Sequence, residues 1–128
     1  MDIVGTADDK EEEAKDKIDC ITLRADMDAL PMPEKNPHID YQTVTDHAHM
    51  CGHDGHTTCL LGLAEFAIKN RHKIPKSKKI RLFFQPAEEL IGGAIKMVEE
   101  GCLEGVKEVY GLHVTPDEKL GTILTKPG

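Results

Sequence analysis

The strongest constraint on the fold is a regular exchange between strand-like and helix-like patterns along the chain. Residues 20–25 (CITLRA) and 79–85 (KIRLFFQ) are rich in β-branched and large apolar side chains, which is typical of strands. Between them, the apolar residues of 55–70 recur at helical spacing. Because strands that alternate with helices form parallel sheets, this order predicts an α/β domain with a largely parallel sheet flanked by helices.

Further elements follow the second strand. Apolar residues at helical spacing between 91 and 98 indicate a second helix, which Gly101 can end in a left-handed cap. Residues 106–114 predict a third strand, and residues 121–125 a short fourth strand. At the start of the first helix, Asp54 is the expected N-cap.

Composition excludes several classes of protein. The 128 residues fit one domain, and a formal net charge of -7 favours a soluble acidic protein over a nucleic-acid binder. The apolar runs are too short to cross a bilayer, and the first ten residues show no secretory signal, so we expect a cytoplasmic protein. The charged run at residues 8–17 (DDKEEEAKDK) is interpreted as a solvated hairpin tip or a short exposed helix.

The four cysteines fall into two groups. In a reducing compartment all of them are expected to be free thiols. Cys20, Cys59 and Cys102 lie in apolar strand or helix patterns, which predicts small buried side chains without a chemical role. Cys51 differs because it lies in a cluster of histidines.

That cluster, residues 46–56 (DHAHMCGHDGH), contains four histidines, one cysteine and two aspartates. Imidazole and thiolate bind zinc and similar divalent ions, and a bend at Gly52 would let Cys51 and His53 face one site. The start of the following helix is expected to lower the thiol pKa. The alternative is a turn with exposed histidines and an incidental cysteine. The remaining histidines are expected to be exposed or to support a ligand; they are His47, His49 and His56.

Other reactive side chains lie where the predicted strands end. Asp26 and Asp28 follow the first strand, Glu88 and Glu89 follow the second, and His113 lies in the third. In parallel sheets, ligands bind beyond the carboxyl ends of the strands. One glutamate could bind metal while its neighbour acts as a general base, although a solvated helix start also explains the pair. A lone histidine in an apolar strand is more often a hydrogen-bonded core residue than a ligand, so the case for His113 depends on its neighbours.

Taken together, four segments closely resemble a known family. They are residues 24–31 (RADMDALP), 49–58 (HMCGHDGHTT), 84–89 (FQPAEE) and 111–114 (GLHV). This pattern is similar to that of the zinc- or manganese-dependent peptidases and amidohydrolases, a family that contains hippurate hydrolases, aminoacylase-like N-acyl-amino-acid amidohydrolases and indole-acetyl-amino-acid hydrolases. The resemblance runs in order through residues 18–128.

The resemblance implies a site with two divalent metal ions, zinc or manganese, that activate a water molecule to attack an amide bond of an N-acyl amino acid or a dipeptide-like conjugate. Glu88 would take the proton from that water and return it to the leaving amine. Asp28 matches an acidic position that orients a ligand, with Asp26 close by. The metal ligands implied by the resemblance are Cys51, His53, Glu89 and His113.

In this family the pattern continues with a lid and dimerisation domain, then a last catalytic segment that supplies a final histidine ligand. Residues 1–128 are therefore interpreted as a partial catalytic domain without those parts, and full-length relatives as homodimers. The expected partner is a small N-acyl amino acid, with no nucleic acid and no membrane.

Two hypotheses follow: a segment of a working amidohydrolase, or a truncated product that binds metal without turnover. A purely structural zinc module is disfavoured, because such sites usually have four cysteine or histidine ligands.

Overall fold

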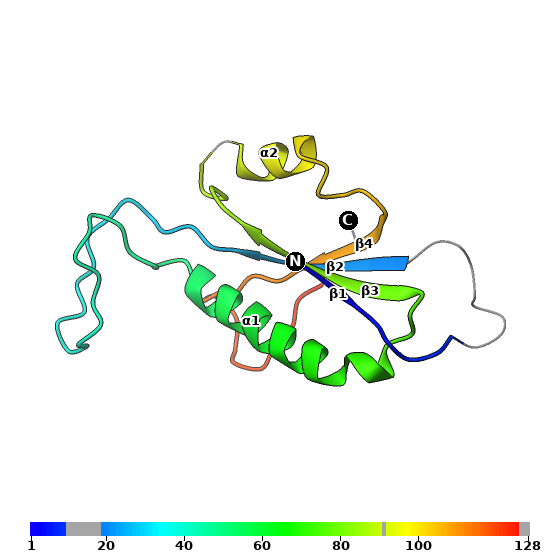
Figure 1. Ribbon diagram of the computed structural model, residues 1–128. Helices are drawn as coiled ribbons and strands as arrows, with labels where there is room; N and C mark the ends of the chain where they lie inside the picture. Colours follow the sequence, from blue (N-terminus) through cyan, green and yellow to red (C-terminus); the bar gives the residue numbers. More distant parts are fainter. Residues whose placement is uncertain (10–18, 91, 126–128) are drawn as a thin grey trace.

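The computed structural model describes residues 1–9, 19–90 and 92–125, and within these ranges four strands form one sheet (Figure 1). The strands are β1 (Asp2–Val4), β2 (Asp19–Asp26), β3 (Lys78–Gln85) and β4 (Val106–Gly111), in the spatial order β1-β3-β2-β4. β2 runs parallel to both β3 and β4, which confirms the largely parallel sheet. The antiparallel edge strand β1, paired with β3, was not predicted and makes the sheet mixed.

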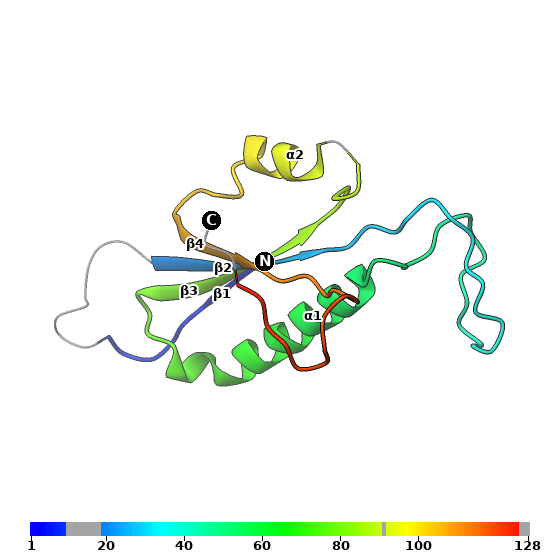
Figure 2. The same cartoon turned by 180° about the vertical axis from the view of Figure 1, so that it is seen from behind.

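The two α-helices cover opposite faces of this sheet (Figures 1 and 2). α1 (His53–Asn70) continues into a short 3-10 turn, η1 (Arg71–Lys73), and α2 (Gly93–Glu99) follows β3. Leu60, Ala64 and Ala67 repeat at helical spacing, so they share one face of α1 and face the sheet. The buried core consists of these three residues with Ile3, Ala25 and Leu82.

The ends of several elements differ from the sequence-based expectation. Gly52, with a left-handed φ of 89°, is the N-cap of α1, so the prediction that Asp54 caps this helix is wrong; Asp54 lies inside the first turn. β4 ends at Gly111, which leaves His113 beyond the strand. Residues 121–125 form no strand, because no neighbouring strand pairs with them within the described part of the chain. Gly101, with φ of 82°, does follow α2 in the left-handed conformation.

All four cysteines are free, as predicted. Cys20 is buried and Cys102 half-buried, but Cys59 is exposed, so the prediction of a buried side chain is wrong there. Cys59 precedes the inward-facing Leu60 on α1 and therefore lies on a different side of the helix.

The charged run is described only at its start. Asp8 forms an ion pair with Lys76 at 2.6 Å, and Asp9 accepts a hydrogen bond from the backbone of Ser77 at 3.0 Å. Residues 10–17, which carry the rest of the predicted hairpin tip or helix, lie outside the described residues. No helix in the described ranges has the length and apolar character needed to cross a bilayer.

The topology brings the predicted reactive residues to one edge. Because β2, β3 and β4 are parallel, their carboxyl ends lie together, and α1 begins at the same edge. Asp26 ends β2, Glu88 and Glu89 follow β3, and His113 follows β4.

Candidate metal centre

His53, the first residue of α1, has one ring nitrogen fixed by hydrogen bonding and the other without a hydrogen-bond partner. Nδ1 lies 3.0 Å from the backbone oxygen of Asp28 and 3.2 Å from its carboxylate Oδ1. A nitrogen that faces two oxygen acceptors carries the proton, so the lone pair lies on Nε2. That Nε2 atom is buried and has no hydrogen-bond partner. An unpaired buried polar atom costs about 1–3 kcal/mol, and a bound cation would remove this cost.

The surroundings of this nitrogen suit a metal ion. Glu89 Oε1 lies 3.8 Å from His53 Nε2. Cys51, His53 and Glu89 each offer one ligand atom, and these atoms lie within 4.8 Å of one another. Thiolate, imidazole and carboxylate together are donors that zinc accepts, and the carboxylate also suits manganese. The donor set therefore fits a divalent metal ion.

His113 completes the group from the other side. Its Nδ1 donates to the backbone oxygen of Val114 at 2.6 Å, which leaves the lone pair on Nε2. Nε2 lies 3.5 Å from Cys51 Sγ. Both His53 and His113 thus have Nδ1 tethered and Nε2 directed toward the same region, an arrangement that metal-binding histidines usually show.

The two glutamates reach the site through a tight turn after β3. Ala87 has a left-handed φ of 49°, which is uncommon for a residue with a side chain. Gly93 at the start of α2 packs directly on this turn, since a Cβ there would lie 1.8 Å from the Pro86 oxygen. Glu89 donates its backbone N–H to Asp28 Oδ2 at 3.0 Å, and the backbone of Glu88 also hydrogen-bonds the Asp28 carboxylate. Both glutamates are exposed.

Negative charge controls the ionisation of this site. Hydrogen bonding to the Glu89 carboxylate, burial and the nearby charge of Glu88 all raise the pKa of the Cys51 thiol. The prediction that the helix start lowers this pKa is therefore wrong, because carboxylates in contact outweigh the partial charge of a helix end. A divalent cation among the same groups would favour the thiolate instead. For Asp28, burial raises the pKa, but hydrogen bonds from the backbone of Glu89 and Glu88 outweigh it and lower the pKa.

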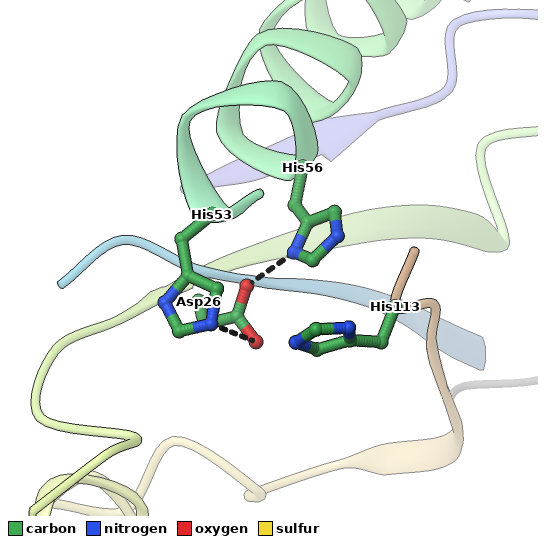
Figure 3. A group of neighbouring side chains, drawn as sticks. All are labelled: Asp26, His53, His56 and His113. Atoms are coloured by element: carbon green, nitrogen blue, oxygen red, sulfur yellow. Dashed lines mark hydrogen bonds and ion pairs between the residues drawn. The ribbon is translucent and has the colours of Figure 1, made fainter. Parts of the chain in front are cut away.

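A second group contains Asp26, His53, His56 and His113 (Figure 3). Asp26 is fully buried; its Oδ1 accepts a hydrogen bond from His56 Nδ1 at 2.6 Å, and its Oδ2 accepts one from Arg24 Nη1 at 2.7 Å. Burial raises the pKa of Asp26, but His56, Arg24 and also His53, whose Nε2 lies 3.7 Å from Oδ2, together lower it below its ordinary value. Asp26 is thus held as a carboxylate whose oxygens are already in use.

The other histidines of residues 46–56 differ in burial. His47 and His49 are exposed, whereas His56 is buried and takes part in the network around Asp26. His53 and His56 are three residues apart on α1 and share one face. That spacing is the sequence signal that could have identified His56 as part of the site.

Comparison with known proteins places this geometry in a family. The model of Peptidase family M20/M25/M40 matches residues 22–128. An N-acetyl-L-cysteine deacetylase of Bacillus subtilis is 49% identical over 110 residues, which cover 84% of this chain and 26% of that protein. The IAA-amino acid hydrolase ILR1-like 4 of Arabidopsis thaliana is 45% identical over 108 residues, or 84% of this chain and 24% of that protein. The chain therefore spans about a quarter of the length of these curated relatives.

A solved structure agrees with the sequence comparisons. The YXEP protein of Bacillus subtilis, described as a dinuclear metal-binding peptidase of the M20 family, is 36% identical and superposes with a TM-score of 0.81. The match covers 99% of this chain and 32% of that protein. The sequence match over residues 22–128 and the shared fold show that the chain belongs to Peptidase family M20/M25/M40.

Proposed function

We propose that this chain provides metal-binding and proton-transfer residues of an enzyme that hydrolyses the amide bond of N-acyl amino acids or dipeptide-like conjugates. The observation that carries the proposal is the buried Nε2 of His53, which has no hydrogen-bond partner and faces the carboxylates of Glu89 and Asp26 beside Cys51. Relatives named as a deacetylase of N-acetyl-L-cysteine and as a hydrolase of IAA-amino acids support this class of substrate.

The proposed cofactor is a pair of divalent ions, zinc or manganese. Two of the ligands are imidazole nitrogens whose opposite ring nitrogens are tethered, one to Asp28 and one to the backbone of Val114. A thiol and a carboxylate lie close to them. The proposed ligands are Cys51, His53, Glu89 and His113.

The remaining residues would divide the chemistry between them. Bound divalent ions would lower the pKa of a water molecule and polarise the amide carbonyl. Glu88, exposed beside Glu89 and close enough to raise the pKa of Cys51, would take the water proton and return it to the leaving amine. Asp28 would keep His53 and Glu89 in place through its two carboxylate oxygens.

A second candidate is a fragment that binds metal without turnover. In favour of this alternative, Glu88 and His113 are both exposed, so residues 1–128 by themselves would not exclude water from the reacting groups. In this view residues 1–128 are a partial catalytic domain, and further parts of the protein would supply the lid, dimer contacts and a last ligand.

The proposed setting is that of an acidic cytoplasmic enzyme with a small-molecule substrate. The net charge of -7 disfavours nucleic acid as a partner, and four free thiols are consistent with a reducing compartment.

A direct test uses both the 128-residue chain and the full-length protein that contains it, each freed of metal with a chelator. Each is then supplied with zinc or manganese and tested on N-acetylcysteine, other N-acyl amino acids, an indole-acetyl amino acid and a dipeptide. We expect metal-dependent hydrolysis by the full-length protein. Hydrolysis by the short chain would exclude the fragment hypothesis. Full metal loading of the full-length protein without hydrolysis of any of these amides would contradict the proposed activity.

A further inference from the structure

His56 differs from the other two histidines of the site because both of its ring nitrogens are already bonded. The backbone N–H of Val114 donates to Nε2 at 3.0 Å, and Nδ1 lies 2.6 Å from Asp26 Oδ1. A backbone N–H can only donate, so Nε2 holds the lone pair and Nδ1 carries the proton that it shares with Asp26. No lone pair of His56 is left for a metal ion, although its ring lies within the group of Figure 3.

The bond to Val114 reaches across the chain to the residue next to His113. Val114 is also held from a second direction, since a Cβ on Gly52 would lie 2.5 Å from Val114 Cγ2. The left-handed Gly52 therefore leaves room for the Val114 side chain against the turn between Cys51 and His53. The backbone and the side chain of Val114 thus both contact the segment that carries the proposed ligands Cys51 and His53.

The rings of the histidines also touch. The ring centroids of His56 and His113 are 4.6 Å apart with an interplanar angle of 66°, so His56 flanks the ring of His113 edge-on. Residues 112–116 are exposed and follow the end of β4. An exposed segment has few packing contacts that could fix a side chain, so His113 is fixed mainly by His56, by Gly52 through Val114, and by its own contact with Cys51.

Asp26, which accepts the hydrogen bond from His56 Nδ1, is itself held in place by several hydrogen bonds. Asp26 is fully buried at the end of β2 and also accepts from Arg24 Nη1 at 2.7 Å. Arg24 Nε donates in turn to Gln85 Oε1 at 2.8 Å at the end of β3. Thr57 Oγ1 donates to the Asp26 backbone oxygen at 3.0 Å. The acceptor for His56 is therefore fixed by two strands and by α1.

We propose that His56, anchored by Asp26, is a positioning residue that fixes the segment carrying His113 against Cys51 and His53, and that it does not bind metal itself. The inference rests on the proposed metal site, and it assigns to His56 a role distinct from that of a ligand. It predicts that His56 affects metal binding only through His113.

The main experiment is a double-mutant cycle on zinc affinity, measured by competition with a chromophoric chelator. His56→Phe keeps a buried ring but removes both hydrogen bonds, and we expect a loss of about 10- to 100-fold in zinc affinity. In a His113→Ala background the same change should cost less than about twofold, because His56 acts through His113. His49→Phe makes the same change at an exposed histidine of the same segment and should leave the affinity unchanged. Equal losses in both backgrounds would overturn the proposal.

Two further variants separate positioning from folding. His56→Gln retains a donor and an acceptor and should restore much of the affinity lost in His56→Phe. If His56→Phe does not fold, Val114→Pro removes the same N–H at an exposed residue, with Val114→Ala as its control that keeps the N–H. The proposal predicts a larger loss for the proline variant than for the alanine variant, which loses only the side-chain contact beside Gly52. Parental affinity in Val114→Pro, or an affinity of His56→Gln no higher than that of His56→Phe, would overturn it.

Hydrogen exchange of the Val114 amide in metal-free protein decides the question independently of metal. We expect slow exchange in the parent chain and fast exchange in His56→Phe, with no change in His49→Phe. Rapid exchange in the parent would overturn the positioning role. If the parent instead shows a protected amide but binds no zinc, the proposed metal site fails while the positioning of the segment stands.

Discussion

Asp28 Oδ1 lies 3.2 Å from His53 Nδ1, and this contact fixes which nitrogen of His53 is available to a metal ion. The other oxygen of the same carboxylate accepts the backbone N–H of Glu89 at 3.0 Å. One side chain at the end of β2 therefore orients two proposed ligands from two other elements, α1 and the turn after β3. The hydrogen bonds from Glu89 and Glu88 also keep the pKa of Asp28 below its ordinary value despite burial, so the residue accepts as a carboxylate.

Replacing Asp28 with alanine should weaken metal binding without removing a ligand. His53 would lose one fixed acceptor and the Glu89 backbone its partner, and loss of such supporting groups typically costs about 10- to 100-fold in metal affinity. Isothermal titration of the metal-free protein with zinc measures the effect. Asp40→Ala, at an exposed aspartate, is the matched control. Equal affinity in the two variants would show that Asp28 does not orient the ligands.

Cys51→Ala and His53→Ala should each cut metal content sharply, because both donors belong to the same group of ligand atoms. Equilibrium dialysis followed by metal analysis gives the stoichiometry. Cys59→Ala makes the same chemical change on the exposed side of α1 and should bind the parental amount of metal. Unchanged stoichiometry in both site variants would refute the assignment of these ligands.

In the full-length protein, substitution of Glu88 should mainly lower turnover, whereas substitution of Glu89 should mainly lower metal affinity. Glu88→Gln is expected to retain its metal but lose about 100- to 10,000-fold in turnover, since it removes a general base. Glu89→Gln should lose metal affinity first and recover part of its activity at high metal concentration. Turnover of an N-acyl amino acid and metal content, measured on the same samples, separate the two outcomes. Parental turnover by a fully loaded Glu88→Gln enzyme would leave Glu88 as a solvated carboxylate without a catalytic role.

The edge strand β1 offers a test of stability away from the site. Asp2 accepts hydrogen bonds from Arg81 at 2.7 and 2.9 Å, which lower its pKa against the effect of burial, with Lys79 adding to the shift. A lowered folded-state pKa means that the stabilisation is fully present above the unfolded value of 3.8 and is lost as pH falls through the folded pKa.

Asp2→Asn should therefore destabilise the protein by about 1 kcal/mol at pH 7, a small value because the pair is partly exposed to solvent. Urea unfolding from pH 7 to pH 3 should show the difference narrowing below pH 3.8. Asp40→Asn again serves as control. A difference that stays constant or grows toward acid would contradict the assigned ion pair.

Much of the site could be predicted because its residues lie at strand ends. Parallel strands bring their carboxyl ends to one edge, so Asp28, Glu89 and His113 were expected to lie together although they are far apart in sequence. The largely parallel sheet followed from the same alternation of strands and helices. The three-residue strand β1 is too short to carry an alternating pattern, and residues 121–125 have strand-like composition but pair with no strand among the described residues.

The local pattern left two alternatives for His56, an exposed residue or a support for a ligand, and could not decide between them. The partners of His56 are Asp26, 30 residues away, and Val114, 58 residues away, so only the folded chain shows that both nitrogens are occupied. The pKa of Cys51 was wrongly predicted for a similar reason. The helix start is visible in the sequence, whereas the contact with Glu89 depends on the turn after β3.

Zinc X-ray absorption spectroscopy of the zinc-loaded protein shows directly whether Cys51 binds metal together with histidine and carboxylate donors. We expect a sulfur neighbour at about 2.3 Å together with nitrogen or oxygen neighbours at about 2.0–2.2 Å. The sulfur contribution should disappear in Cys51→Ala and persist in Cys59→Ala. A parent spectrum fitted by nitrogen and oxygen alone, or a sulfur signal that survives in Cys51→Ala, would contradict the proposed site.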